Sequence, residues 1–210
     1  MKGILLFAAA VTLAGQSPAL AVNIVFGASC SPQQSQAIQS AFDRATARSE
    51  ATYRALNRPL AEWSNDQKAA YITWFGPFDE QRLMRVGAVL DSIRSQLSND
   101  NVTYNVECMT PYNPATEEGC RPGDYAAALP NQRFQQSMLF CDGFFGGQAY
   151  GGYDTQWGSV LHEVTHSAAN TEDHSYSPQN ARNLAPGKKV DNADNYEYFF
   201  ENLYINAGPN

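Results

Sequence analysis

The apolar residues in the first half of the chain recur at helical spacing. Ser31, followed by a proline, is typical of a helix start, and few helix-breaking residues follow before Leu56. Ser64 can cap a shorter helix that extends to Trp74. Residues 79–97 predict a third helix with one buried face. That face would carry Leu83, Val86, Val89, Leu90, Ile93 and Leu97.

The middle of the chain has the pattern of strands and irregular loops instead of helices. Residues 102–107 and 137–141 are short segments typical of strands. A long irregular connection is expected between them, followed by a glycine-rich stretch over residues 143–152. The chain therefore predicts a single α+β domain with N-terminal helices and a small sheet. The residues that mark the irregular connection are Pro111, Pro114, Gly119, Pro122, Gly123 and Pro130.

The first residues have the pattern of an export signal. Lys2 precedes a short apolar run over residues 4–13, and the Ala-Leu-Ala at residues 19–21 fits the small-x-small rule for signal-peptidase cleavage. The apolar run is too short to span a bilayer. We therefore expect residues 1–21 to be a signal peptide, residues 22–210 to be the mature domain, and the protein to be secreted and extracellular.

Composition then narrows the classes of function. The formal net charge of -7 at pH 7 argues against a general nucleic-acid binder, which needs a basic surface. No later stretch is long and apolar enough for a membrane span, so no membrane partner is expected. An even number of cysteines in an exported chain predicts disulfides, and four cysteines allow three pairings. These cysteines are Cys30, Cys108, Cys120 and Cys141.

The candidate chemistry lies on a helix expected from Thr155 or Asp154 to about residue 169. His162 and His166 are four residues apart, so both imidazoles project from one helical face and can hold one zinc ion. Glu163 follows the first histidine and completes an HExxH pattern. Zinc acidifies a bound water, and an adjacent carboxylate can take its proton as the water attacks a carbonyl carbon. The pattern predicts metal-assisted peptide hydrolysis.

A catalytic zinc site needs a third protein ligand. The metzincin spacing would place a histidine at position 172, where this chain has Glu172, so that pattern does not apply. Three acidic candidates stay open on the residues alone: Asp173 in the following loop, and Glu197 or Glu201 further along. His174, next to Asp173, can compete as a ligand or contact a ligand from outside.

Three motifs in one order make the last third of the chain similar to the aspzincin family. That family comprises the deuterolysins and the fungal peptidyl-Lys metalloendopeptidases. The similarity extends from Cys30 to the C-terminus, and its most specific part covers residues 162–202. The motifs are HExxH at 162–166, Thr171-x-Asp173-x-x-Tyr176, and Asn-Ala-Asp-Asn-Tyr-Glu-Tyr-Phe at 192–199. The resemblance implies a single zincin-like α+β domain with one required zinc ion per chain.

The resemblance also assigns a role to each matching residue. It implies zinc on His162, His166 and Asp173, with Glu163 as the general base. Tyr176 matches the tyrosine that steadies the oxyanion of the tetrahedral intermediate, where a phenol can donate a hydrogen bond. It further implies disulfides Cys30–Cys108 and Cys120–Cys141, which stabilise the domain outside the cell.

Two further acidic residues match positions that line the pocket for the residue after the scissile bond in peptidyl-Lys enzymes. Asp194 and Glu197 are three apart on an expected helix, so they share a face and can bind one ammonium group. The resemblance therefore implies an endopeptidase that acts as a monomer on protein or peptide substrates and prefers Lys after the cut. A helix-capping Asp194 and a solvated Glu197 are the structural alternative.

Two other classes of protein remain as rivals. One is a secreted zinc-binding effector that keeps the fold but has little proteolytic activity. The intact Glu163 and Tyr176 argue against it, because a binding protein needs neither. The other is a structural disulfide-linked protein, which would not bind one zinc ion through the histidines.

Overall fold

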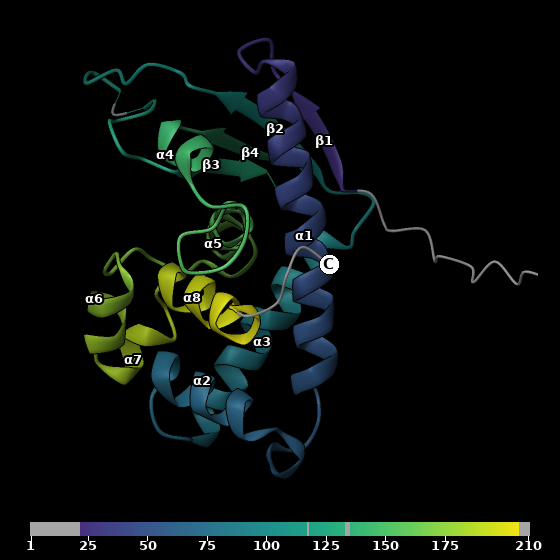
Figure 1. Ribbon diagram of the computed structural model, residues 1–210, viewed down its shortest axis with the longest axis vertical. Helices are drawn as coiled ribbons and strands as arrows, with labels where there is room; N and C mark the ends of the chain where they lie inside the picture. The colour runs from purple at the N-terminus through teal and green to yellow at the C-terminus, as the bar shows by residue number, and fades with distance from the viewer. Residues whose placement is uncertain (1–21, 117, 133–134, 206–210) are drawn as a thin grey trace, which may run out of the picture.

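The computed structural model describes residues 22–116, 118–132 and 135–205. The expected signal peptide, residues 1–21, lies outside the described residues. Figure 1 shows a sheet at one end of the molecule and a group of helices at the other, with α5 between them. In chain order the elements are β1 (Asn23–Phe26), α1 (Pro32–Leu56), the short 3-10 helix η1 (Leu60–Glu62), α2 (Asn65–Phe75), α3 (Glu80–Leu97), β2 (Thr103–Cys108), β3 (Ala126–Gln132), β4 (Gln135–Phe140), α4 (Asp142–Gly146), α5 (Gln156–Ala169), α6 (Pro178–Asn183), α7 (Pro186–Lys189) and α8 (Ala193–Tyr204).

The three predicted N-terminal helices are confirmed, with starts that follow from their caps. The Ser31 hydroxyl accepts from the Gln34 backbone N–H, and the Gln34 side chain accepts from the Ser31 N–H. Ser64 and Gln67 form the same reciprocal pair at the start of α2. Such a capping box satisfies backbone donors that the first helical turn leaves free. Asp79 caps α3 in a simpler way, by accepting from a backbone N–H.

The sheet has four strands in the order β1-β2-β4-β3. The first three run parallel, and β3 pairs antiparallel with β4 at one edge. The predicted strands at 102–107 and 137–141 correspond to β2 and β4. The α+β class predicted from the sequence is therefore confirmed.

The irregular connection is shorter than predicted, because β3 forms within it. The prolines and glycines predict a connection that extends through Pro130, but this residue lies inside β3. An edge strand has one side without a ladder partner, so it tolerates a proline that an inner strand would exclude. The glycine-rich stretch likewise contains part of a short helix, α4.

The helix that carries HExxH is buried on most of its surface. α5 packs against α1, α3, α8 and the edge strand β3. Its apolar residues Trp157, Val160, Leu161 and Val164 belong to the main hydrophobic core. Figure 1 shows α8 lying beside α5 on the side away from the sheet. An element held from several sides can keep its side chains in fixed positions.

The C-terminal segment is joined to α2 by aromatic and polar contacts. Phe75 of α2 packs against Tyr196 and Phe199 of α8, with ring centroids 4.9 and 5.1 Å apart. Lys189, at the end of α7, is buried and donates from Nζ to the Thr73 carbonyl at 3.1 Å. Burial lowers the pKa of this lysine. It therefore anchors the α7 segment to α2 instead of serving as a surface charge.

Two disulfides tie the irregular segments to the sheet. Cys30 bonds with Cys108, and Cys120 bonds with Cys141, which are the pairs that the resemblance implies. The first joins the segment before α1 to the end of β2, and the second joins the proline-rich connection to the end of β4. Within the part of the chain that the structure describes, no helix has the length and apolar character needed to cross a membrane.

Candidate metal centre and substrate cleft

The local sequence fixes where α5 begins and ends. The Thr155 hydroxyl accepts from the Gly158 backbone N–H at 3.0 Å and caps the helix. Asn170 ends it in a left-handed conformation, which asparagine adopts more readily than most residues. The chain then turns back, so that the loop after α5 faces the histidines. The backbone of this loop pairs with the start of α8 through Glu172 and Asn192.

Three candidate ligand atoms, two from α5 and one from the loop that follows it, converge at one point. The Nε2 atoms of His162 and His166 are 3.2 Å apart. Asp173 Oδ1 lies 3.2 Å from Nε2 of His162 and 3.3 Å from Nε2 of His166. Two imidazole nitrogens and one carboxylate oxygen are a donor set that suits a catalytic zinc ion. The structure thus brings together the three residues that the resemblance assigns to the metal.

The other ring nitrogens of both histidines have acceptors. Nδ1 of His166 lies 2.8 Å from the Thr171 carbonyl oxygen. Nδ1 of His162 lies 2.9 Å from Asp194 Oδ1 and 3.2 Å from Glu197 Oε2. A carbonyl or carboxylate at Nδ1 keeps the proton on that nitrogen and leaves the Nε2 lone pair free for a metal. This tautomer preference is a second, independent fit between the residues and zinc.

The pKa values of His162 and Asp173 also fit a site for a cation. Burial opposes a charged His162, but hydrogen bonds with Asp173, Asp194 and Glu197 raise its pKa well above 6.5. Burial also opposes the ionised form of Asp173, yet the two histidines lower the pKa of this carboxyl group. The metal-free site therefore favours a cation between the ligands, and a metal ion can replace the protons.

Glu163 lies beside the ligands without being one of them. It is buried, and its Oε2 accepts from the Ala128 N–H of β3 at 2.5 Å. Burial raises the pKa of Glu163, although both histidines oppose the shift. A higher pKa makes the carboxylate a stronger base, as proton abstraction near neutral pH requires.

The loop after α5 places Tyr176 and His174 in different surroundings. Tyr176 lines the cleft with 62% of its surface exposed. Partial burial and the neighbouring Asp173 raise the pKa of Tyr176 to about 12, so the phenol keeps its proton. His174 instead turns away and lies 3.3 Å from Asp191. His174 does not join the three converging ligand atoms.

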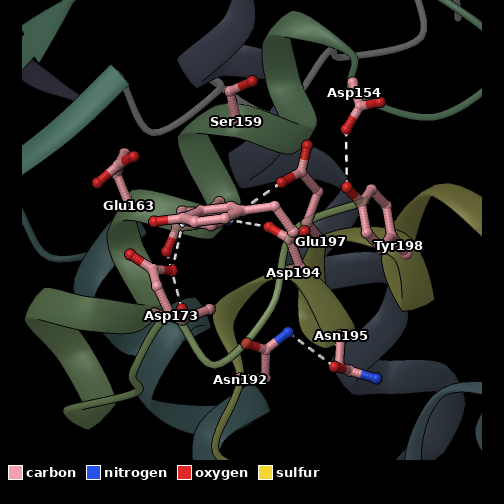
Figure 2. Close-up of polar contacts among 12 residues, drawn as sticks. Asp154, Ser159, Glu163, Asp173, Asn192, Asp194, Asn195, Glu197 and Tyr198 are labelled. Carbon is pink, nitrogen blue, oxygen red and sulfur yellow. Dashed lines mark hydrogen bonds and ion pairs between the residues drawn. The ribbon is translucent and has the colours of Figure 1, made fainter. Parts of the chain in front are cut away.

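A cavity of about 460 Å³ opens beside His162, and acidic residues line much of it. Asp194 and Glu197 lie in its wall, both buried in the first turns of α8. Figure 2 shows Asp194 and Glu197 together on one side of the site and Glu163 on the other. Asp194 does not cap its helix, because Asn192 holds that position. Burial raises the pKa of Glu197 to about 7 despite the hydrogen bond from His162.

The structure also shows supporting roles that the sequence does not reveal for Glu201 and Asn192. Glu201 is buried and accepts from the Thr155 N–H at 2.7 Å, so it supports the start of α5 and is not a metal ligand. Asn192 donates to the Ser175 carbonyl and accepts from the Ser175 N–H, which fixes the loop that carries Asp173. The Asn-Ala-Asp-Asn motif at residues 192–195 is the available signal, but a motif alone does not show which segments its side chains join.

This fold and site define a class of protein. A helix with HExxH beneath an edge strand, a third ligand from the next loop, and a buried glutamate are together the features of a zincin-type metallopeptidase domain. The comparison with a family model then narrows the class. Residues 61–201, more than half of the chain, match the aspzincin family, described as lysine-specific metallo-endopeptidase. The chain belongs to the aspzincin family.

Individual relatives agree with this assignment. An extracellular protease of Aeromonas hydrophila is 30% identical over 191 residues, which are 88% of this chain and 49% of the relative. A peptidyl-Lys metalloendopeptidase of Armillaria mellea is 28% identical, covering 82% of this chain and 45% of the relative. The chain thus spans about half the length of these curated relatives. A solved zinc peptidase from Grifola frondosa matches 83% of this chain and 98% of its own, with a TM-score of 0.65 and 25% identity.

Proposed function

We propose that this chain is a secreted zinc endopeptidase that cuts protein chains before Lys, with residues 22–210 as its catalytic domain. The observation that carries the proposal is the convergence of His162, His166 and Asp173 beside the buried Glu163. Two disulfides support an extracellular location, because such bonds persist in oxidising surroundings. The Aeromonas relative, which is named an extracellular protease, points the same way.

The two histidines and Asp173 would hold one zinc ion, which supplies the Lewis acidity that polarises a scissile carbonyl and lowers the pKa of water. Glu163 takes the proton of the water that attacks the carbonyl carbon. Its raised pKa and its fixed contact with the Ala128 N–H suit this role. The same carboxyl group can then pass the proton to the leaving amine.

Tyr176 is proposed to stabilise the oxyanion that develops on the carbonyl oxygen. Its phenol stays protonated at neutral pH, because its pKa is about 12. A donor already aimed at the developing charge lowers the barrier without reorganisation. The exposure of Tyr176 at the cleft leaves it accessible to a substrate.

The preference for Lys rests on the acidic cavity beside His162. Asp194 Oδ1 already contacts His162, and Asp194 Oδ2 has no hydrogen-bond partner among the residues that the structure describes. A buried carboxylate oxygen without a partner is costly unless a cation occupies the space next to it. An ammonium group from the residue after the scissile bond would supply that cation, with Glu197 as a second partner.

The proposal is tested by digesting an unstructured protein with the purified mature chain and reading every cut by mass spectrometry. We expect cuts before Lys that stop with a zinc chelator and return when zinc is restored. Chelator-sensitive cuts without a Lys preference would keep the zinc chemistry and reject the assigned pocket. A folded protein that holds one zinc ion and cuts nothing would favour the non-catalytic effector instead.

Glu163→Gln separates catalysis from metal binding. The substitution keeps the size of the side chain and removes its ability to accept a proton, so turnover should fall by at least about 10²-fold. Zinc content should stay at one ion per chain, because Glu163 is not a ligand. Turnover near the wild-type rate in the zinc-loaded variant would reject Glu163 as the base.

A further inference from the structure

The cavity beside His162 contains a third carboxylate that the proposed function does not use. Asp154 precedes α5 and lines the same cavity as Asp194 and Glu197. Its Oδ1 accepts a hydrogen bond from the Tyr198 hydroxyl at 2.8 Å. Figure 2 shows this contact next to the Glu197 side chain. Asp154 therefore lies outside α8, which carries the other two carboxylates, but it lines the same cavity.

The backbone of Asp154 is held in an uncommon conformation. Its φ is 58°, in the left-handed region that few residues other than glycine, asparagine and aspartate adopt. Glu201 supports this conformation by accepting from the Asp154 N–H at 3.2 Å and from the Thr155 N–H at 2.7 Å. Gly158 makes room for that carboxylate, since a Cβ there would lie 2.2 Å from Glu201 Oε1. Buried groups thus fix the place of Asp154.

The neighbouring carboxylates act on the charge of Asp154. Burial and then repulsion from Asp194 raise the pKa of Asp154, against the effect of the hydrogen bond from Tyr198. Asp194 Oδ2, which has no hydrogen-bond partner among the described residues, belongs to a side chain that lines the same cavity. Arg121 also lines the cavity, and its guanidinium donates to the Tyr112 hydroxyl at 2.9 Å. A cationic side chain from a substrate would meet a negative potential from both sides.

We infer that Asp154 is a specificity-determining residue, whose fixed carboxylate extends the cation pocket of Asp194 and Glu197 to a second wall. This inference rests on the proposed function. The pocket would then select a basic side chain after the scissile bond by charge as well as by contact. Neutral side chains of the same length would place no positive charge between Asp154 and the two α8 carboxylates and are disfavoured.

Asp154→Asn is the appropriate test variant. Asparagine has the same shape and tolerates the left-handed backbone, so the change removes mainly the charge. Two peptides are compared that differ only after the scissile bond, one with Lys and one with norleucine, its neutral analogue. The ratio of their kcat/KM values should fall roughly five- to tenfold in the variant, as expected for one charge lost near an ammonium group. The kcat/KM for the norleucine peptide should fall by a smaller factor than the kcat/KM for the Lys peptide.

Asp124→Asn provides the matched control. Asp124 lines the same cavity, but it belongs to the loop at the rim, where its Oδ2 accepts from the Arg121 backbone N–H at 2.8 Å. The same loss of charge there should change the Lys-to-norleucine ratio by less than about twofold, because solvent screens a charge at the rim. Both variants are compared at one zinc ion per chain.

The outcomes separate this inference from the proposed function. If the wild type prefers Lys and Asp154→Asn keeps the same ratio, the inference is wrong and the proposed function stands. An equal loss with both peptides would assign Asp154 a structural role and would also overturn the inference. A wild-type enzyme that cuts both peptides equally well would reject the Lys preference itself.

Discussion

At the scale of single residues, His162 connects the metal centre with the acidic cavity. One ring nitrogen faces His166 and Asp173, and the other donates to Asp194. A carboxylate on the second nitrogen orients the ring and raises its basicity as a ligand. The sequence predicts substrate binding or helix capping for Asp194, whereas in the structure one of its carboxylate oxygens contacts His162 and the other has no hydrogen-bond partner among the described residues.

Asp194→Asn should therefore weaken two properties at once. Zinc affinity is expected to fall by roughly 10- to 100-fold, as is typical when such an outer partner of a ligand is lost. Cleavage before Lys should fall more than cleavage before apolar residues. Competition with a chromogenic chelator measures the first effect, and Glu163→Gln is the control that should keep wild-type zinc affinity. Wild-type affinity in Asp194→Asn would show that the contact with His162 does not support the metal.

At the scale of elements, the first turn of α5 is fitted closely to α8. Gly158 faces two buried carboxylates, and a Cβ there would lie 2.2 Å from Glu201 Oε1 and 2.9 Å from Glu197 Oε1. Glu201 cannot move away without losing its hydrogen bonds to the backbone at the start of α5. A glycine inside a helix is unfavourable by itself, so its presence here reflects the approach of these groups.

Gly158→Ala should destabilise the protein by at least about 2 kcal/mol, because a buried carboxylate must be displaced. Gly87→Ala in α3 is the matched control. A Cβ at Gly87 meets no atom within 4 Å, so alanine there should stabilise the helix by roughly 0.5–1 kcal/mol. Urea unfolding of both variants measures the difference. Similar stabilities for the two variants would contradict the fit of α5 against Glu201.

Local signals explain which elements the sequence could predict. α1, α2 and α3 begin at caps made by neighbouring residues, and their boundaries were close to those expected. β3 was missed because it contains a proline and small alanines, which are poor strand formers away from an edge. The HExxH spacing also predicts that His162 and His166 project from one helical face, because they are only four residues apart. The local sequence predicts only a possible capping role for Asp154, since its contact with Tyr198 spans 44 positions.

At the scale of the whole molecule, the buried cleft sets how the stability of the metal-free protein depends on pH. The pKa of Glu197 is about 7 in the folded protein against an ordinary 4.5, so the folded state holds this proton more tightly than the unfolded chain does. Stability falls as pH rises through that interval. The pKa of His162 lies well above 6.5, so its contribution is complete below 6.5 and is lost as pH rises further.

With a chelator present, the urea midpoint should therefore be lower at about pH 8 than at about pH 5. Added zinc should raise the midpoint at the higher pH, because the ion binds the folded state and replaces the protons of the ligands. Glu197→Gln removes one titrating group, so the urea midpoint of this variant should fall less between pH 4.5 and about pH 7. Equal midpoints at the two pH values in the metal-free protein would contradict these shifts.

The anchored lysine of α7 has a consequence for self-digestion. The chain has only four lysines, against ten arginines, and three of them lie in the described part: Lys68, Lys188 and Lys189. Lys68 lies in the first turn of α2, and Lys189 is buried against the Thr73 carbonyl. An endopeptidase that needs Lys after the scissile bond would find few cuttable bonds in its own fold. The bond before the exposed Lys188 is the weakest point, and the folded enzyme should outlast a lysine-rich substrate during long digestion.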